Sequence, residues 1–433
     1  MSHVRRPSRI RHAMVDLSPL RDFRDYRLLW LGQSVNVVGT QITRVALPYQ
    51  VYVLTGSTLS IAALTTVQLI PLLLFSLGGG SLADAFDRRR LLLVTQVGLA
   101  ASSGALALVS FAGNPSLAIL FAIAFVAASF QAIDGPTRTS AVTRLVPAHR
   151  LPAAIALGQL SFNAGSVIGP AIGGLVLATV GPTGAYTVDV VTFAVFIVTL
   201  TTLRPIPPVV AGARRGVSAI AEGLRFVRSR RVILSTFAID LNAMVFGMPQ
   251  ALFPALSLGV FHAGAVGVGL LNAAPALGAL LGAAISGIAT RIRRVGRGII
   301  VAVVVWGAAI VLFGVSTFSF ALALFFLAVA GAADVFSAVL RSSVVQLSTP
   351  DELRGRVSAI HLLVVISGPR AGDIEAAGVA SIIGAQLSAI SGGVLCLFGV
   401  LVVARLFPDL DRHEAATPPS APGAREPAAE AAA

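Results

Sequence analysis

The sequence has 433 residues, of which 12% are charged and 56% are apolar. Soluble domains carry about twice that share of charge, so we expect this chain to be solvated by lipid. All 32 basic residues are arginine, and the absence of lysine excludes a phosphate-binding P-loop, a Schiff-base lysine and a Ser-Lys dyad.

The remaining polar residues do not indicate a metal or cofactor site. Cys396 is the single cysteine, and the six histidines are scattered without metal-ligand spacing. The net charge of +13 could indicate nucleic acid, but the arginines cluster between apolar runs, where membrane topology explains them. We therefore expect no cofactor, no metal and no nucleic-acid partner, and a monomer embedded in a lipid bilayer.

Twelve apolar runs follow one another, and each is long enough to cross about 30 Å of hydrocarbon as a helix. They predict an all-α integral membrane protein with twelve transmembrane helices. The runs lie near residues 28–53, 59–80, 91–112, 117–138, 153–178, 184–203, 232–256, 265–290, 298–316, 318–341, 357–381 and 385–406. The predicted parts are a basic cytoplasmic tail (1–26), an N-terminal six-helix half (27–203), a cytoplasmic linker (204–231), a C-terminal six-helix half (232–407) and a disordered cytoplasmic tail (408–433).

The arginines test this count because membrane proteins keep basic loops on the cytoplasmic side. Every connection after an even-numbered run carries arginine, whereas the connections after odd-numbered runs carry none. The pattern predicts a multi-pass protein of the inner (plasma) membrane with both termini in the cytoplasm. Within the linker, Ile220, Leu224 and Val227 have helical spacing beside arginines, which indicates an amphipathic helix on the membrane surface. A flexible linker is the alternative.

A charged loop, Gly78–Arg90, separates the second and third runs. Its form, Gly-x-x-x-Asp followed by a basic cluster, resembles the loop 2–3 signature of the major facilitator superfamily, although the family usually has a basic residue at Ala85 and a glycine at Asp87. Helix starts stabilise carboxylates, and arginine can fork onto a carboxylate. The resemblance implies an inner latch beside the fourth and eleventh helices. Its expected members are Asp84, Arg88, Arg89, Asp134 and Arg138. The alternatives are a plain positive-inside loop and an isolated Asp134–Arg138 pair.

The fifth run carries a motif of small residues that matches an exporter signature. Gly165, Gly169, Pro170, Gly173 and Gly174 fit Gly-x-x-x-Gly-Pro-x-x-Gly-Gly position for position, a pattern associated with exporters of the superfamily. Glycines four apart let two helices approach closely, and the proline bends the helix. Ordinary packing of small residues is the alternative. The match favours export over uptake.

Further segments, including 44–57, 355–360 and 368–376, resemble the enterobactin-exporter branch of the superfamily over about residues 20–407. This resemblance implies the major facilitator fold and export of siderophores or drugs driven by the proton gradient. The two halves also repeat, because Arg138 precedes Pro147 by the same spacing as Arg341 precedes Pro350. Such repeats are typical of two pseudo-symmetric halves around a site near the membrane midplane.

Charges inside the runs are few, and each costs roughly several kcal/mol in hydrocarbon if it is unpaired. The residues that we expect to act in proton coupling or substrate binding are Arg44, Asp240, Asn242, Arg370, Asp373 and Glu375. Arg44 could instead be a snorkelling arginine, and Asp240 could make a plain interhelix hydrogen bond. A carboxylate in apolar surroundings takes up a proton more readily than one in water.

The eleventh run is interrupted by Arg370, Asp373 and Glu375, the first candidate for proton coupling or an anionic cargo. We expect Arg370 and Asp373 to pair at helical spacing, leaving Glu375 free to titrate. Asp189, in a peripheral run, is expected to pack or to bond with Tyr186. Asp334 and Arg341 are seven residues apart, so they should share a helix face without touching.

These features predict a secondary exporter of a siderophore or an amphipathic drug-like molecule, working by alternating access while protons run inward. Gln159, Asn163 and Asn272 are further candidates for polar contacts with the cargo. An importer of a small solute with the same fold is the alternative, and the direction of flux separates the two. An enzyme is not expected, because the runs contain no His-Glu-x-x-His, no Gly-x-Ser-x-Gly and no evident cysteine–histidine pairing.

Overall fold

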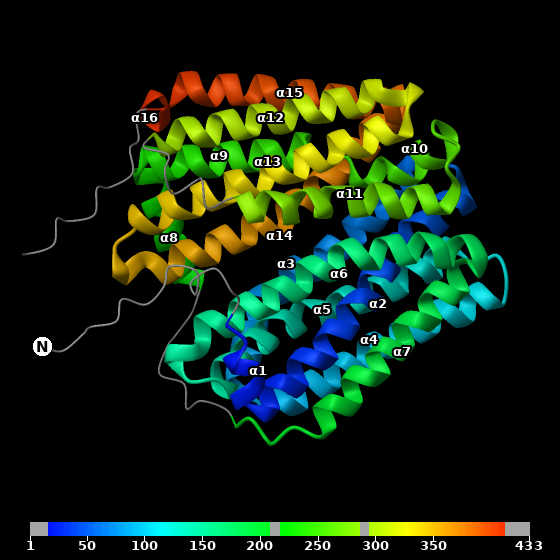
Figure 1. The fold of residues 1–433 in the computed structure, drawn as a ribbon, viewed down its shortest axis with the longest axis vertical. Coiled ribbons are helices and arrows are strands. Elements are labelled where there is room, and N and C mark those ends of the chain that lie inside the picture. The colour runs from blue at the N-terminus through cyan, green and yellow to red at the C-terminus, as the bar shows by residue number, and fades with distance from the viewer. Residues whose placement is uncertain (1–15, 208–216, 286–293, 412–433) are drawn as a thin grey trace, which may run out of the picture.

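The computed structural model describes residues 16–207, 217–285 and 294–411, and the chain folds into two bundles of helices (Figure 1). The N-terminal bundle contains α2 (Arg24–Thr55), α3 (Thr58–Ala85), α4 (Arg88–Phe111), α5 (Leu117–Leu145), α6 (Leu151–Thr179) and α7 (Gly181–Thr201). The C-terminal bundle contains α9 (Arg231–Phe246), α10 (Phe253–Gly259), α11 (Gly264–Ile285), α12 (Val295–Val315), α13 (Phe320–Leu347), α14 (Asp351–Ile383) and α15 (Ala385–Leu406).

Eleven segments among the described residues are long and apolar enough to cross a membrane. The twelfth is α2, a 32-residue helix that carries more polar side chains than the others. These side chains find partners inside the bundle: Asn36 Nδ2 donates to Gln96 at 3.3 Å, and Gln41 Nε2 donates to Ser166 at 2.9 Å. A polar membrane helix is tolerated where its polar face meets protein and not lipid. The predicted twelve-helix, all-α fold is confirmed.

The seventh span differs from the continuous helix that the sequence predicted. It is broken between α9 and α10 by Gly247, Pro249 and the short 3₁₀ helix η3 (Gln250–Leu252). Backbone groups that a break frees inside a membrane must find new partners. Trp306 Nε1 donates to the Gly247 carbonyl at 3.0 Å, and the Ala251 N–H donates to the Asp373 carboxylate at 2.9 Å.

The segments outside the spans also depart from the predicted boundaries. Two helices lie in regions assigned to the tails: α1 (Ser18–Asp22), with α2 starting just after it, and α16 (Pro408–Asp411). The predicted disorder from residue 408 is therefore wrong for α16, where Leu410 is fully buried near Gly296. Residues 1–15 and 412–433 lie outside the described residues.

The linker contains a helix, α8 (Val217–Ser229), where the apolar spacing predicts one. Val227 packs in a small cluster with Val357 and Ile360 of α14. Glu222 also pairs with Arg356 of α14, so α8 is attached to the C-terminal bundle.

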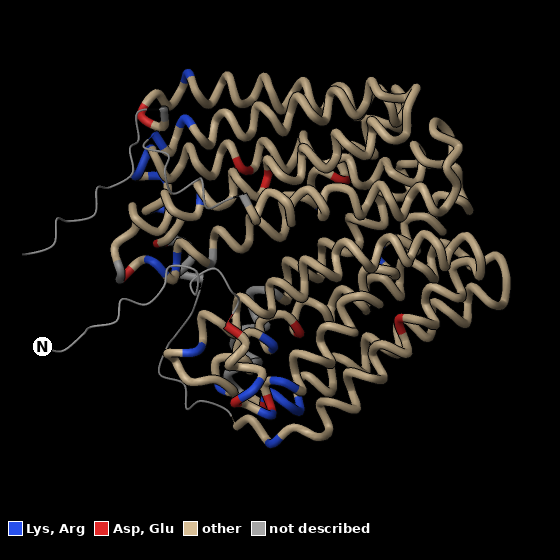
Figure 2. Tube along the Cα trace, viewed as in Figure 1, with Lys and Arg blue, Asp and Glu red and all other residues tan. Residues whose placement is uncertain are grey.

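The two bundles meet mainly where α6 packs on α11 and α3 packs on α14. Figure 1 shows them diverging at the end where the N-terminus leaves, and Figure 2 shows most arginines gathered at that end. We call it the arginine-rich end, and the opposite end the arginine-poor end. The contact of α6 with α11 involves Gly174 and Ala265, both near the arginine-poor ends of their helices.

The motif of small residues on α6 serves two helix contacts. Gly165, Gly169 and Gly173 face α2, and a Cβ atom at Gly169 would lie 3.0 Å from the carbonyl oxygen of Val38. Gly174 faces α11 instead, where a Cβ atom would lie 2.9 Å from the Ala265 carbonyl oxygen. The first three glycines therefore pack within the N-terminal bundle, and Gly174 allows the two bundles to touch.

We expect Gly174→Ala to destabilise the protein, because the added methyl group meets backbone atoms of α11 and overpacking costs about 1–3 kcal/mol. Gly158→Ala on the same helix is the matched control, since nothing lies within 4 Å of its Cβ position. Alanine is the better helix former by up to about 1 kcal/mol, so the control should hold or gain stability. Thermal unfolding in detergent measures both, and equal melting temperatures would contradict this packing.

Candidate functional site

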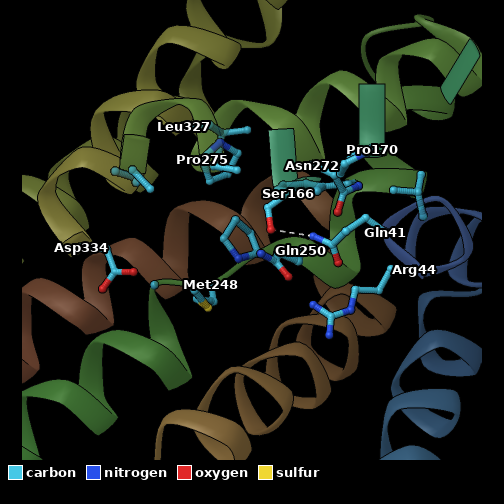
Figure 3. A pocket seen from close by; sticks show the side chains of 18 of the residues that line it. Gln41, Arg44, Ser166, Pro170, Met248, Gln250, Asn272, Pro275, Leu327 and Asp334 are labelled. Atoms are coloured by element: carbon cyan, nitrogen blue, oxygen red, sulfur yellow. Dashed lines mark hydrogen bonds between the residues drawn. The ribbon is translucent and has the colours of Figure 1, made fainter. Parts of the chain in front are cut away.

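A cavity of about 300 Å³ lies between the two bundles. Its walls come from α2 and α6 of the N-terminal bundle and from the α9–α10 break, α11, α12 and α13 of the C-terminal bundle. Figure 3 shows Arg44 and Asp334 on opposite sides of it, with the hydrogen-bonded Gln41 and Ser166 between them. The polar lining residues are Gln41, Arg44, Asn163, Ser166, Gln250, Asn272, Trp306 and Asp334, and the apolar ones include Phe162, Phe253, Ile310 and Leu327.

The structure places three of the predicted cargo contacts in this wall, namely Arg44, Asn163 and Asn272. Gln41 and Asp334 also line the cavity, although neither was predicted to do so from the sequence. Gln41 lies three residues before Arg44, so the shared helix face was a signal that could have identified it. Asp334 had been expected only to share a helix face with Arg341.

Asn242 and Asp189, by contrast, make contacts within a bundle. Asn242 Nδ2 donates to the Cys396 carbonyl at 2.9 Å, which ties α9 to α15. The carboxylate of Asp189 accepts hydrogen bonds from Thr43 and Ser103, each at 2.7 Å. The expected bond with Tyr186 is wrong, because the Tyr186 hydroxyl donates to Gln50 Oε1.

The charged residues of α14 do not form the predicted pair. Arg370 Nη1 donates to Gln68 Oε1 of α3 at 3.1 Å, whereas Asp373 accepts from the Ala251 N–H at the helix break. Because α14 packs between α3 and the broken span, the two side chains turn to different neighbours. Arg370 and Asp373 interact with each other and with Arg44 electrostatically, at longer range than an ion pair.

Glu375 is half-buried, and it has no hydrogen-bond or ion-pair partner in the described part of the chain. The expected titration of Glu375 stays a prediction. The cavity-lining residues include Arg44 but not Arg370, Asp373 or Glu375.

Two carboxylates share one guanidinium inside the C-terminal bundle. Arg341 of α13 lies 2.8 Å from Asp240 of α9 and 3.5 Å from Asp334 of its own helix. The expectation that Arg341 and Asp334 do not touch is wrong, because a long helical side chain extends back towards the N-terminus and can span two turns. Asp240 and Arg341 are buried, whereas the Asp334 side chain is 29% exposed.

The N-terminal bundle holds a similar but better satisfied pair. Arg138 contacts Asp134 on the same face of α5, and Asp134 also accepts hydrogen bonds from Thr95 at 3.0 Å and Gln96 at 2.7 Å. The Arg138 guanidinium also lies over the Phe196 ring at 5.4 Å, a cation–π contact.

The remaining members of the predicted latch lie at the arginine-rich end. Arg88 donates to the Pro207 carbonyl at 2.7 Å, and Arg89 donates to the Leu200 carbonyl at 2.9 Å. The Leu200 carbonyl is in the last turn of α7, where basic side chains commonly satisfy the free carbonyls of a helix. The side chain of Asp84 lies outside the described ones, so the latch stays a prediction.

Known proteins resemble this chain over nearly its whole length. Residues 14–431 match the profile of a family described as transmembrane secretion effectors. The enterobactin exporter EntS of Escherichia coli K12 is 26% identical over 407 residues, which cover 94% of this chain and 97% of the relative. The enterobactin exporter EntS of Citrobacter koseri is 25% identical over 393 residues, covering 91% and 93%.

Solved structures show the same fold at low sequence identity. A bacterial homologue of the human lysosomal transporter Spinster, inward-facing and unoccupied, has a TM-score of 0.70 at 15% identity and covers 91% of this chain and 98% of its own. The nucleoside transporter NupG has a TM-score of 0.69 at 15% identity, with 90% and 99% covered.

We expect Arg341→Leu to be strongly destabilising, because it leaves the buried Asp240 without a partner, a loss that typically costs about 3–5 kcal/mol. Arg138→Leu is the matched variant, since Asp134 keeps Thr95 and Gln96 as donors. Arg138→Leu should therefore lose clearly less stability than Arg341→Leu. Thermal unfolding of the two variants in detergent measures the difference, and an equal loss would contradict the contrast between the two sites.

Proposed function

The chain belongs to the transmembrane secretion effector family of the major facilitator superfamily, and we propose that it is a secondary exporter of a small molecule coupled to the proton gradient. The observation that carries this proposal is the cavity between the bundles, with an arginine on one side and a carboxylate on the other. A site built from two pseudo-symmetric halves suits alternating access, in which the halves rock around the bound molecule.

The state described by the structure is closed at the arginine-poor end, where α6 and α11 touch, and the bundles diverge at the arginine-rich end. If basic loops face the cytoplasm, this is the inward-facing state that would load cargo. Export then requires the arginine-rich end to close. We propose that Asp84, Arg88, Arg89, Asp134 and Arg138 form the latch on that side.

We propose that the cargo is a siderophore or an amphipathic drug-like molecule. The apolar walls suit aromatic or aliphatic groups, Arg44 can donate to an anionic or acceptor group, and Asp334 can accept from O–H or N–H donors. The relatives named enterobactin exporters support the siderophore class.

Arg370 and Asp373, which we first expected to act in proton coupling or in binding an anionic cargo, are now proposed to report which end is open. The bond between Arg370 and Gln68 crosses from one bundle to the other, so rocking of the halves must strain or break it. Asp373 fixes the break in the seventh span beside the cavity. Together with Arg44, these groups connect cargo binding to the contact between α3 and α14.

Transport is tested in inside-out vesicles that are acidified inside. We expect gradient-dependent uptake of at least one of four probes, namely enterobactin, erythromycin, tetracycline and ethidium, and its collapse with an uncoupler. Arg44→Gln should lower the uptake of an anionic probe about tenfold or more, since a charge-assisted hydrogen bond to a desolvated group is typically worth about 1.5–3 kcal/mol. Arg230→Gln, at the exposed arginine-rich end, is the control. Efflux of a nutrient without uptake of any probe would favour the importer.

Cysteine labelling tests the orientation. Ser116, in the turn at the arginine-poor end, and Ser229, at the end of α8, are both exposed, and Cys396 is buried. In intact cells a membrane-impermeant maleimide should label Ser116→Cys and spare Ser229→Cys. The reverse pattern would place the termini outside and contradict the proposed direction of export.

A further inference from the structure

The cluster of Asp240, Asp334 and Arg341 has one carboxylate more than it can neutralise. We call these three residues the Arg341 cluster. Asp240 and Asp334 lie on different helices and both contact the same guanidinium group, at 2.8 Å and 3.5 Å. With all three groups ionised the cluster carries a net charge of −1 inside the bundle. A buried net charge is costly, and taking up a proton removes it.

The N-terminal half, which is related to the C-terminal half by the internal repeat, shows that the extra carboxylate is not a general feature of the fold. Arg138 and Arg341 have the same spacing to their following prolines, but Arg138 faces one carboxylate. The pseudo-equivalent of Asp134 in the C-terminal bundle is Ser337, and its hydroxyl accepts a hydrogen bond from Arg341 at 3.0 Å. The N-terminal pair is therefore balanced, and the second acid is particular to the C-terminal half.

The Arg341 cluster is also less completely hydrogen-bonded than its counterpart. In the part of the chain that the structure describes, neither carboxylate oxygen of Asp240 has a hydrogen-bond partner, whereas Asp134 accepts from Thr95 and Gln96. Among the described residues, the Nε atoms of Arg341 and Arg138 both lack a partner, so the difference lies in the acids. The 2.8 Å contact is thus an ion pair without hydrogen-bond geometry. Arg341 contacts both acids, so a change of charge at Asp334 alters how the guanidinium is shared between them.

Asp334 is the member that meets the cavity. It lines the cavity opposite Arg44, and its side chain is 29% exposed, against 1% for Asp240 and 2% for Arg341. A proton or a cargo group that enters the cavity therefore reaches Asp334 before it can reach the other two.

We propose that Asp334 is the group that takes up and releases the coupled proton, with Arg341 and Asp240 as its positioning residues. This assignment rests on the proposed function of proton-coupled export. The ionised Asp334 accepts from a cargo O–H or N–H and is held by Arg341. When Asp334 is protonated, Arg341 and Asp240 are left as a neutral pair, and the carboxyl group no longer attracts the cargo. Proton and cargo thus exclude each other at one side chain, as exchange requires.

The surroundings leave few other groups to control this proton. Besides its two partners in the cluster, the charged or titratable group facing Arg341 is His361 of α14, which interacts with it electrostatically. Of the neighbouring helices, the described part of α11 carries no charged residue, and α12 carries only Arg297, near the arginine-rich end.

A direct test is infrared difference spectroscopy of the purified, lipid-reconstituted protein during a pH titration, which needs no cargo. We expect the protonated carboxyl band that appears on acidification to contain a component that is lost in Asp334→Asn and returns with a shifted midpoint in Asp334→Glu. Asp189→Asn is the matched control, because Asp189 is a buried acid with two hydroxyl partners away from the cavity. A titrating band that is the same in Asp334→Asn as in the unchanged protein, or no titrating band in the unchanged protein, would overturn the assignment.

Vesicle transport separates this inference from the proposed function. With a probe that the unchanged protein accumulates, Asp334→Asn should reduce gradient-driven accumulation at least tenfold while probe–probe exchange without a gradient survives. Accumulation that survives in Asp334→Asn would keep the exporter and reject Asp334 as the coupling group. If the unchanged protein accumulates none of the probes, proton-coupled export of those molecules fails, and the infrared titration still decides whether Asp334 binds the proton.

Discussion

The close approach of α6 and α11 is the constraint on which the arrangement of the two bundles depends. Gly174 and Gly269 face each other there, and a Cβ atom at Gly269 would lie 2.4 Å from the Pro170 carbonyl oxygen. Lipid offers helices no hydrophobic drive to associate, so backbone contact between small residues supplies packing energy instead. Because this contact lies at the arginine-poor end, the bundles can part at the other end, and the cavity sits between the two regions.

The need of polar groups for partners at membrane depth explains how α2 and the broken seventh span line the cavity. Each polar backbone or side-chain group at membrane depth needs a partner or an aqueous space. Trp306 and Asp373 form hydrogen bonds with backbone groups at the break after α9, and Gln41 donates a hydrogen bond to Ser166. Arg44 and Asp334 face the cavity and keep part of their surface exposed. These two residues are thus open to ligands, whereas Asp134 and Asp240 are paired with arginines inside their bundles.

Much of the fold could be predicted from sequence, because the length of each apolar run and the positions of the arginines are local signals. The partners of the charges could not, since they depend on which helices pack together. Arg370 and Asp373 satisfy the spacing of an intrahelical pair, yet α3 and the helix break offer each a different partner. Asn242 is directed to α15, and Arg341 reaches two turns back to Asp334. The few charged residues inside the membrane spans can be identified from the sequence, but which of them face the cavity depends on how the helices pack.

In the proposed transport cycle the two bundles rock about their contact and open one end at a time. Spin labels at Thr143→Cys and Leu347→Cys, which are exposed at the arginine-rich end, with a second pair at Phe111→Cys and Phe318→Cys at the arginine-poor end, would measure it by pulsed electron resonance in lipid. The account predicts two distance populations in each pair, with opposite shifts as the pH is changed. Single, pH-independent distances at both ends would contradict alternating access coupled to protons.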